Sequence, residues 1–224
     1  MTPLTPSPTP NSLQQYAYDA IKAAILDFTC QPGSGLVEAD LARQLGMSKT
    51  PVREALGRLE REGFVFKIPY TGYLVVPISQ HTMHEIFQIR AALEGLSARM
   101  AAERFSPRAA ALAVEFLEEH ARADRTGDIV RAAKFNRHFH GLLIECAQNQ
   151  HLGQILFNLD EHLQRYRLLA SFQKGRLEKS IAEHQRILSA LQAGNPDEAE
   201  AAARAHILGD RKSTRLNSSH RIRS

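Results

Sequence analysis

The sequence predicts a mainly α-helical protein: a small N-terminal domain of three helices and a two-stranded β-hairpin, followed by an all-α antiparallel bundle of six to seven helices. Three observations predict this fold. The 224 residues suit one or two domains. The first third contains two short helical patterns around a glycine turn, followed by a β-rich segment at 64–76. Beyond Pro77, hydrophobic residues recur every three or four positions, as in amphipathic helices.

The composition is that of an ordinary globular protein and excludes several classes of protein. Hydrophobic residues make up 43% of the chain and charged residues 23%, which excludes a wholly disordered, collagenous or disulfide-stapled chain. Cys30 and Cys146 belong to no C-x-x-C spacing, so neither a zinc ribbon nor a redox dithiol is encoded. With no apolar run of membrane-spanning length and no signal-peptide pattern, we expect a cytoplasmic protein that has no membrane partner.

The two ends of the chain are expected to lie outside the folded domains. Residues 1–10 are rich in Pro and Thr, which predicts a disordered arm. Residues 211–224 hold five basic residues and no acidic one, so the net charge of +4 comes from this segment. This tail has no helical periodicity and resembles translated cloning or adapter sequence. We expect it to be non-native or disordered, and we assign it no function.

Residues 11–78 are predicted to form the N-terminal domain. Its expected helices span Ser12 to Phe28, Glu38 to Leu45 and Ser48 to Glu62. The second and third of these helices flank Gly46, the arrangement of a helix-turn-helix, and Ser48 or Thr50 is expected to cap the third. The β-rich segment 64–76 contains a Pro-Tyr-Thr-Gly turn and predicts a hairpin. Together these elements describe a winged helix.

The start of the third helix is the candidate DNA-reading element, because this part of a helix-turn-helix enters the major groove. Lys49 and Arg53 are four residues apart and project from one face, while Ser48 and Thr50 are short donors suited to phosphate oxygens. The alternative interpretation is that Lys49 and Arg53 are solvated surface charges. Segment 11–80 holds seven basic and seven acidic residues, so binding would use a focused patch.

Residues 82–208 are predicted to form the helical bundle. The expected helices span Thr82 to Glu103, Ser106 to Ala123, Asp128 to Ala147, Leu152 to Phe172, Arg176 to Ala193 and Asn195 to Leu208. N-caps are expected at Ser106, Asp128 and Asn195.

Three histidines fall in the core register of these helices: His140, His184 and His206. Asn136 lies one turn before His140 on the same stripe. Because polar groups buried without partners are costly, two interpretations remain: convergence on a divalent cation, or separate core-edge histidines that each hydrogen-bond to a neighbour. The other histidines are expected at the surface or at core edges: His81, His84, His120, His138, His151, His162 and His220.

The stretch PGSGLVEADLARQLGMSKTPVREALGRLEREGFV resembles the winged helix of the GntR family of bacterial transcriptional regulators, whose signature is close to PG-x-x-L-x-E-x-x-LA-x-x-LG-x-SR-T-PVREAL-x-x-L-x-x-EG. The resemblance implies groove contacts by Ser48, Lys49, Thr50 and Arg53, and a minor-groove approach by the hairpin tip at Gly72. Lys49 replaces the usual Arg, which keeps the charge but loses the bidentate fork.

Residues 82–208 resemble the FCD effector domain of the FadR subgroup of that family. Arg90-Ala-Ala-Leu-Glu94 is similar to its R-x-x-L-E opening, and its D-x-x-x-H, H and H metal positions fall on Asn136, His140, His184 and His206. The resemblance implies a bound divalent metal such as Zn²⁺ or Ni²⁺, weakened because Asn136 replaces Asp. Arg90 either helps to bind an effector carboxylate or forms an i,i+4 ion pair with Glu94.

The resemblance implies a ligand-responsive repressor of metabolic genes, not an enzyme. Its expected partners are a palindromic double-stranded DNA operator, a small carboxylate effector and a second copy of the chain. Two alternatives remain. One is a metalloenzyme, although Glu183, next to His184, is expected on a different helix face and no acid or base lies beside the histidines. The other is a metal-responsive regulator without an organic effector.

Overall fold

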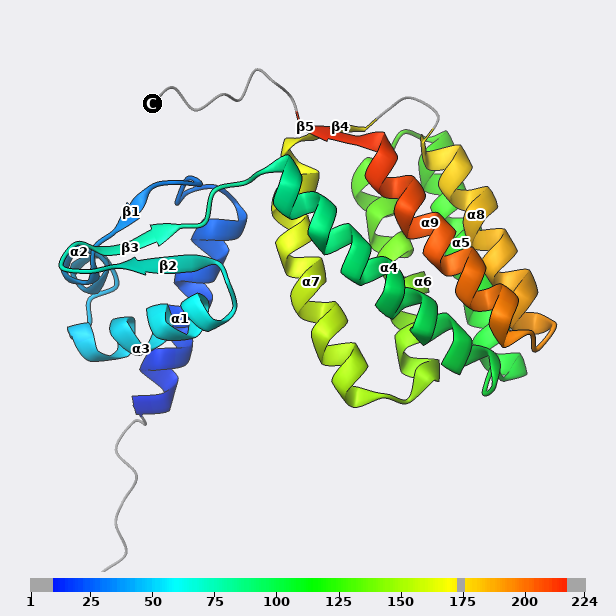
Figure 1. The fold of residues 1–224 in the computed structure, drawn as a ribbon, viewed down its shortest axis with the longest axis horizontal. Helices are drawn as coiled ribbons and strands as arrows, with labels where there is room; N and C mark the ends of the chain where they lie inside the picture. The colour runs from blue at the N-terminus through cyan, green and yellow to red at the C-terminus, as the bar shows by residue number, and fades with distance from the viewer. Residues whose placement is uncertain (1–9, 173–175, 217–224) are drawn as a thin grey trace, which may run out of the picture. The chain divides into compact units, whose positions relative to one another are not determined.

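Helices dominate the computed structural model, which describes residues 10–172 and 176–216. The chain divides into two units, Met1–Ser79 and Gln80–Ser224 (Figure 1). The sequence predicted a mainly helical protein with an N-terminal winged helix-turn-helix and a helical bundle, and both are confirmed.

The N-terminal unit contains three helices and a small antiparallel sheet. Its elements are α1 (Pro10–Leu26), β1 (Gly35–Leu36), α2 (Glu38–Gln44), α3 (Lys49–Arg61), β2 (Val65–Ile68) and β3 (Gly72–Val75). The sheet has the order β1-β3-β2, so it contains one strand more than the predicted hairpin. Strand β1 was not predicted, because two residues are too few to show the alternation of a strand.

The core of this unit lies where α1 packs against α3. One face of α3 is fully buried, through Val52, Ala55, Leu56 and Leu59. A charged cluster closes the edge of this core, where Lys22 Nζ lies 3.0 Å from Glu62 Oε2 and 4.9 Å from the centre of the Phe64 ring. Burial alone would raise the pKa of Glu62, but hydrogen bonds from Tyr18, Lys22 and other donors outweigh it and lower that pKa. The cluster therefore links α1 to the C-terminal end of α3.

Gly72 holds a structural position in the sheet and does not form the hairpin tip, so this part of the prediction is wrong. Its φ is +131°, and a Cβ there would lie 2.6 Å from the Leu36 carbonyl oxygen. Only glycine therefore lets β1 approach β3 so closely. Gly72 is already paired with Ile68, and the hairpin tip is formed by Tyr70, which is fully exposed, and Thr71.

The described part of the second unit contains six helices. They are α4 (Gln80–Ala102), α5 (Pro107–Arg125), α6 (Ile129–Ala147), α7 (Gln150–Leu169), α8 (Arg176–Gln192) and α9 (Pro196–Ser213). The three predicted N-caps form: Ser106, Asp128 and Asn195 each accept a hydrogen bond from a backbone N–H three residues later. In Figure 1, α4 lies between α7 and α9, and it also contacts α6 and α8.

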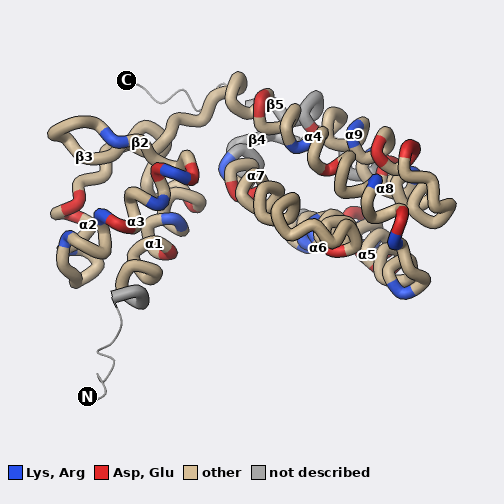
Figure 2. The backbone as a smooth tube through the Cα atoms, turned by 60° about the horizontal axis from the view of Figure 1, so that its bottom comes forward, with Lys and Arg blue, Asp and Glu red and all other residues tan. Residues whose placement is uncertain are grey.

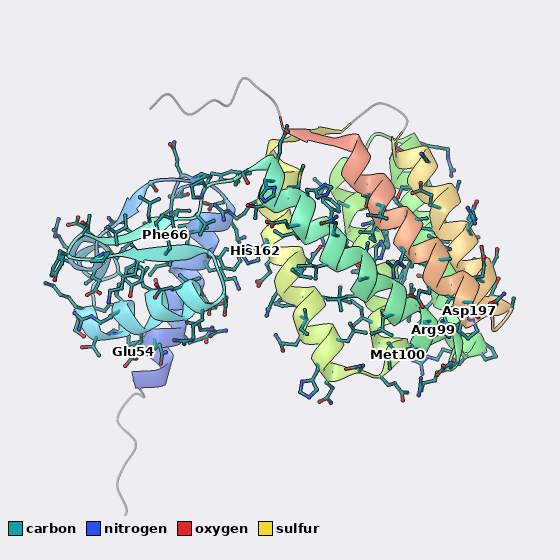
Figure 3. All side chains as sticks on the ribbon, in the orientation of Figure 1. Glu54, Phe66, Arg99, Met100, His162 and Asp197 are labelled. Atoms are coloured by element: carbon teal, nitrogen blue, oxygen red, sulfur yellow. The ribbon has the colours of Figure 1, made fainter. Side chains whose placement is uncertain are left out.

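The contact between α4 and α9 is close and carries charge on its outer edge. A Cβ on Gly95 would lie 2.5 Å from Cγ of Arg204, so the two helices approach across this glycine. Arg99 donates to Asp197 and, at 3.2 Å, to Glu200, and Figure 3 shows Arg99 and Asp197 side by side. Small residues line the buried side of this contact: Ala98, Ala101, Ala102, Ala199, Ala202 and Ala203. Among the described residues, no helix has the length and hydrophobicity needed to cross a membrane.

The C-terminal end of the described chain differs from its prediction. Helix α9 continues to Ser213, and β5 (Thr214–Leu216) pairs antiparallel with β4 (Ala170–Phe172). Residues 211–216 are therefore regular, where an irregular tail was expected. Basic residues are good helix formers and suit a helix C-terminus, while three-residue strands are too short for a pattern. Residues 1–9 of the predicted arm and 217–224 of the predicted tail lie outside the described residues.

Candidate DNA-reading face and histidine cluster

The four residues predicted to read DNA come together at the start of α3. Ser48 is the N-cap residue, Lys49 and Thr50 begin the helix and Arg53 follows one turn later, and all four are exposed. The expected cap hydrogen bond is absent: among the described residues, the Ser48 side chain accepts none from the helix. These side chains therefore lie on the surface, whereas the opposite face of α3 is in the core.

Arg53 is held by an acidic residue that the sequence analysis did not connect to it. Its Nε lies 3.0 Å from Glu38 Oε2, and its Nη2 lies 2.8 Å from the same oxygen. The hydrogen bond to Glu38 raises the pKa of Arg53. Basic and acidic residues are mixed along α2 and α3 (Figure 2).

The three core-register histidines converge in the second unit, from three different helices. His140 lies on α6, His184 on α8 and His206 on α9, and their side chains are buried. Nε2 of His184 lies 3.2 Å from Nε2 of His140 and 3.0 Å from Nε2 of His206. The three histidines are therefore not separate, because Nε2 of His184 lies close to the same atom of the other two rings, although each ring also has a hydrogen-bonding neighbour.

Two carboxylates stand behind two of these rings. Glu94 Oε2 lies 2.9 Å from Nδ1 of His140, and Glu183 Oε2 lies 2.8 Å from Nδ1 of His206. A carboxylate only accepts, so each Nδ1 carries the hydrogen and donates it. In the neutral rings, Nε2 then presents a lone pair. The Nε2 atoms of His140 and His206 can then accept an N–H from Nε2 of His184, or all three Nε2 atoms can bind one shared cation.

The separations between the three nitrogens fit a metal ion. For a cation ~2.0–2.1 Å from each imidazole nitrogen, angles between octahedral and tetrahedral correspond to N···N separations of about 2.9–3.4 Å, and the distances from Nε2 of His184 to Nε2 of His140 and of His206 both lie in this range. The carboxylates that orient two rings are the usual outer partners of metal-binding histidines. The donor set thus fits a divalent cation held by His140, His184 and His206.

Glu94 connects this cluster to Arg90. Arg90 Nη2 lies 2.9 Å from Glu94 Oε1, which is the i,i+4 ion pair considered for it. Both side chains are almost fully buried. Burial alone would raise the pKa of Glu94, but His140 and Arg90 outweigh burial and hold that pKa far below its usual range. Glu94 is therefore ionised and balances the charge of Arg90 while it orients His140.

A cavity of about 360 Å³ adjoins the cluster between α4, α6 and α7. Asn136, which is half-buried, lines this cavity together with His140 and Glu94. The remaining lining is partly apolar and partly charged, and includes Arg90, Arg137, Ile144, Leu156, Phe157 and Asp160. Asn136 and His140 thus both border a space large enough for a small organic molecule.

Sequence reasoning missed three residues of this site. Glu183 was expected to face away from the histidines, yet it reaches His206 rather than its neighbour His184. His120 was placed at the surface or a core edge, but it is 1% exposed, and its ring centre lies 5.8 Å from that of His184. A signal for His120 did exist, because it continues the buried stripe of α5 formed by Ala109, Ala113, Leu117 and Ala123. Glu94 was recognised only as the partner of Arg90.

The role of Glu183 is open to a direct test. Glu183→Gln removes the carboxylate behind His206, and losing such a partner typically weakens metal binding about 10- to 100-fold. We expect that loss for Zn²⁺ in competition titrations with a chromophoric chelator. The matched control is Glu198→Gln, which breaks an exposed pair with Arg186 on the same pair of helices. Equal affinities in the two variants would contradict the orienting role.

Both units match known protein families. Residues 13–75 match the gntR family of bacterial regulatory proteins, and residues 85–209 match the FCD domain. The Nta operon transcriptional regulator of Aminobacter aminovorans is 32% identical over 79% of this chain and 82% of its own. The probable D-xylose utilization operon transcriptional repressor of Paenarthrobacter nicotinovorans is 30% identical over 78% of this chain and 76% of its own.

A solved structure shows the same arrangement of elements. The Escherichia coli protein McbR/YncC superposes with a TM-score of 0.69 at 26% identity, covering 88% of this chain and 94% of its own. The matched families and relatives are transcriptional regulators, not enzymes, and GntR regulators bind DNA operators. This chain belongs to the GntR family of bacterial transcriptional regulators and carries an FCD domain.

Proposed function

We propose that this regulator represses its target genes and leaves its operator when a small carboxylate binds beside a divalent cation in the helical unit. The observation that carries the proposal is the convergence of three Nε2 atoms, 3.0 and 3.2 Å apart, next to a cavity of about 360 Å³. The cation would be held by His140, His184 and His206.

A cation bound at the histidines would make this cavity favour an anionic effector. The charged side chains of the lining balance, since Arg90 and Arg137 face Glu94 and Asp160, so the cation would supply the excess positive charge. Asn136 is neutral, so a bound cation keeps one more positive charge than it would beside an aspartate. The cation supplies electrostatic attraction and an open coordination position for a carboxylate oxygen. The apolar part of the lining, such as Phe157, suits the carbon skeleton.

In the N-terminal unit, Ser48, Lys49, Thr50 and Arg53 are the proposed groove contacts. We assign the minor-groove contact of the wing to the hairpin tip at Tyr70, because Gly72 packs against Leu36 within the sheet. A homodimer would place two such units on half-sites about one helical turn apart, ~34 Å. Repression is supported by the relative whose name describes a repressor. The effector must bind the DNA-competent and DNA-incompetent states differently.

A thermal-shift screen tests the effector site. Purified protein, stripped with a chelator, is heated with a panel of small carboxylates in the presence and absence of Zn²⁺ or Ni²⁺. A ligand that binds only the folded state raises the melting temperature, so we expect at least one carboxylate to do so only when metal is present. That carboxylate should also release the protein from DNA. Equal shifts with and without metal would contradict the cation's role, and release by metal alone would favour the metal-responsive alternative.

A further inference from the structure

The side chains of Arg53 and Glu38 form a bidentate pair between the two helices of the helix-turn-helix. Glu38 is the first residue of α2, and Arg53 lies one turn into α3. Three contacts join them: Nε to Oε2 at 3.0 Å, Nη2 to Oε2 at 2.8 Å and Nε to Oε1 at 3.2 Å. The carboxylate therefore occupies one edge of the guanidinium.

The other edge of the guanidinium remains available to a ligand. A guanidinium has five N–H groups in a rigid plane, and Glu38 uses those on Nε and one side of Nη2. Nη1 and the second hydrogen of Nη2 form the end edge, whose spacing matches O6 and N7 of guanine. The Arg53 side chain is 62% exposed, and the contacts with Glu38 involve Nε and Nη2 but not Nη1.

Glu38 follows closely on a strand of the small sheet. Leu36 in β1 pairs with Tyr73 in β3, and α2 begins two residues after Leu36. Tyr73 is buried, and the side chain of Glu38 is only 21% exposed. Burial raises the pKa of Tyr73, and the nearby carboxylates of Glu60 and Glu38 raise it further. The carboxylate therefore lies largely covered, close enough to the buried Tyr73 to influence its pKa, and it contacts Arg53 from this position.

We propose that Glu38 is a positioning residue that sets the preference of this regulator for guanine. It fixes the plane of the Arg53 guanidinium before DNA arrives, so that the end edge meets guanine and not a nearby phosphate. Without its contact to Glu38, the long Arg53 side chain would adopt several conformations and could bind either a base or a phosphate. The inference rests on the proposed role of Arg53 in base reading.

This role predicts opposite effects on specific and nonspecific binding. Glu38 carries a negative charge near the DNA-reading face, so it opposes the attraction of phosphates that drives nonspecific binding. Removing the charge should therefore leave nonspecific affinity unchanged or raise it, while guanine discrimination falls. A purely structural role would lower both affinities together, because the helix-turn-helix itself would be disturbed.

The experiment begins with duplexes selected from a randomised pool by the wild-type full-length protein. Each guanine of the preferred duplex is then replaced by 7-deazaguanine, which lacks N7, or by inosine, which keeps both N7 and O6. For the wild type, 7-deazaguanine at the base read by Arg53 should lower affinity about tenfold, whereas inosine should not. Arg53→Ala should remove this penalty and so identify the base.

Glu38→Gln should reduce the 7-deazaguanine penalty to about twofold, without loss of affinity for a random-sequence duplex. The matched control is Asp40→Asn, which removes another acid from the first turn of α2 and breaks its pair with Arg43. The control should retain the full penalty. Circular dichroism and melting curves of both variants show whether α2 and α3 remain folded.

The outcomes separate this inference from the proposed function. If Glu38→Gln keeps the full penalty, or loses specific and nonspecific affinity equally, the positioning role is wrong while Arg53 can still read the base. If Arg53→Ala retains the wild-type profile at every guanine, the assignment of Arg53 to base reading is itself wrong. The positioning role stands only if Arg53→Ala and Glu38→Gln both lose the guanine penalty and Asp40→Asn does not.

Discussion

Arg53→Ala is expected to abolish recognition of the operator while leaving the N-terminal unit folded. An arginine bound to guanine contributes roughly 1 to 3 kcal/mol of discrimination, and a homodimer uses it in both half-sites. The summed loss is therefore roughly 2 to 6 kcal/mol, or more than about thirtyfold in affinity. Fluorescence anisotropy with the selected duplex at fixed salt measures the loss.

The exposure of Arg53 makes this variant clean to interpret. Its guanidinium contacts Glu38 at the surface, and the buried face of α3 is not touched. Arg43→Ala is the control, because Arg43 is an exposed arginine on α2 paired with Asp40. We expect it to bind the selected duplex nearly as well as the wild type. Unchanged operator binding by the Arg53 variant would remove the proposed readout.

The second large effect is expected at the histidine cluster. His140→Ala and His184→Ala should each reduce metal content from about one ion per chain to a small fraction, because two imidazoles hold a divalent ion far more weakly than three. Both variants should lose the effector response and keep DNA binding in the absence of effector. Mass spectrometry of digested protein gives the metal content, and anisotropy gives the DNA affinity.

His138→Ala is the matched control for these variants. His138 lies on α6 two residues before His140, but it is exposed and packs against Phe116, 5.2 Å between ring centres. It should keep the metal. Because a buried imidazole leaves a gap when it is removed, the melting temperature of each metal-free variant is compared with that of metal-free wild type. Equal metal content in wild type and both cluster variants would reject the site.

The helices predicted well from the sequence are those whose ends are marked by a glycine or by a capping residue. Gly46 and the capping residue Ser106 mark boundaries that the structure reproduces within a few residues. The inward faces were also readable, because spacings of three and four residues placed His140, His184 and His206 in the core register. Periodicity states which side of a helix is buried, and for that purpose it was sufficient.

Periodicity does not state which residue of another helix meets a buried side chain. Glu94 reaches His140 across 46 residues of sequence, and Glu183 reaches His206 across 23. Both contacts depend on how neighbouring helices slide past each other, which no spacing within one helix encodes. The pairing of Glu38 with Arg53 was missed for the same reason, since it joins two helices through a turn.

Metal binding by the three imidazoles would also affect the stability of the helical unit against unfolding. His184 lies 44 residues after His140 and 22 before His206, so an ion held by all three would tie α8 to α6 and to α9 at once. A cross-link of this kind stabilises the folded state as a disulfide does, because it lowers the conformational entropy of the unfolded chain. The entropy loss is larger for a long loop than for a short one. An occupied unit should therefore resist proteases and partial unraveling of α8 more than a stripped one.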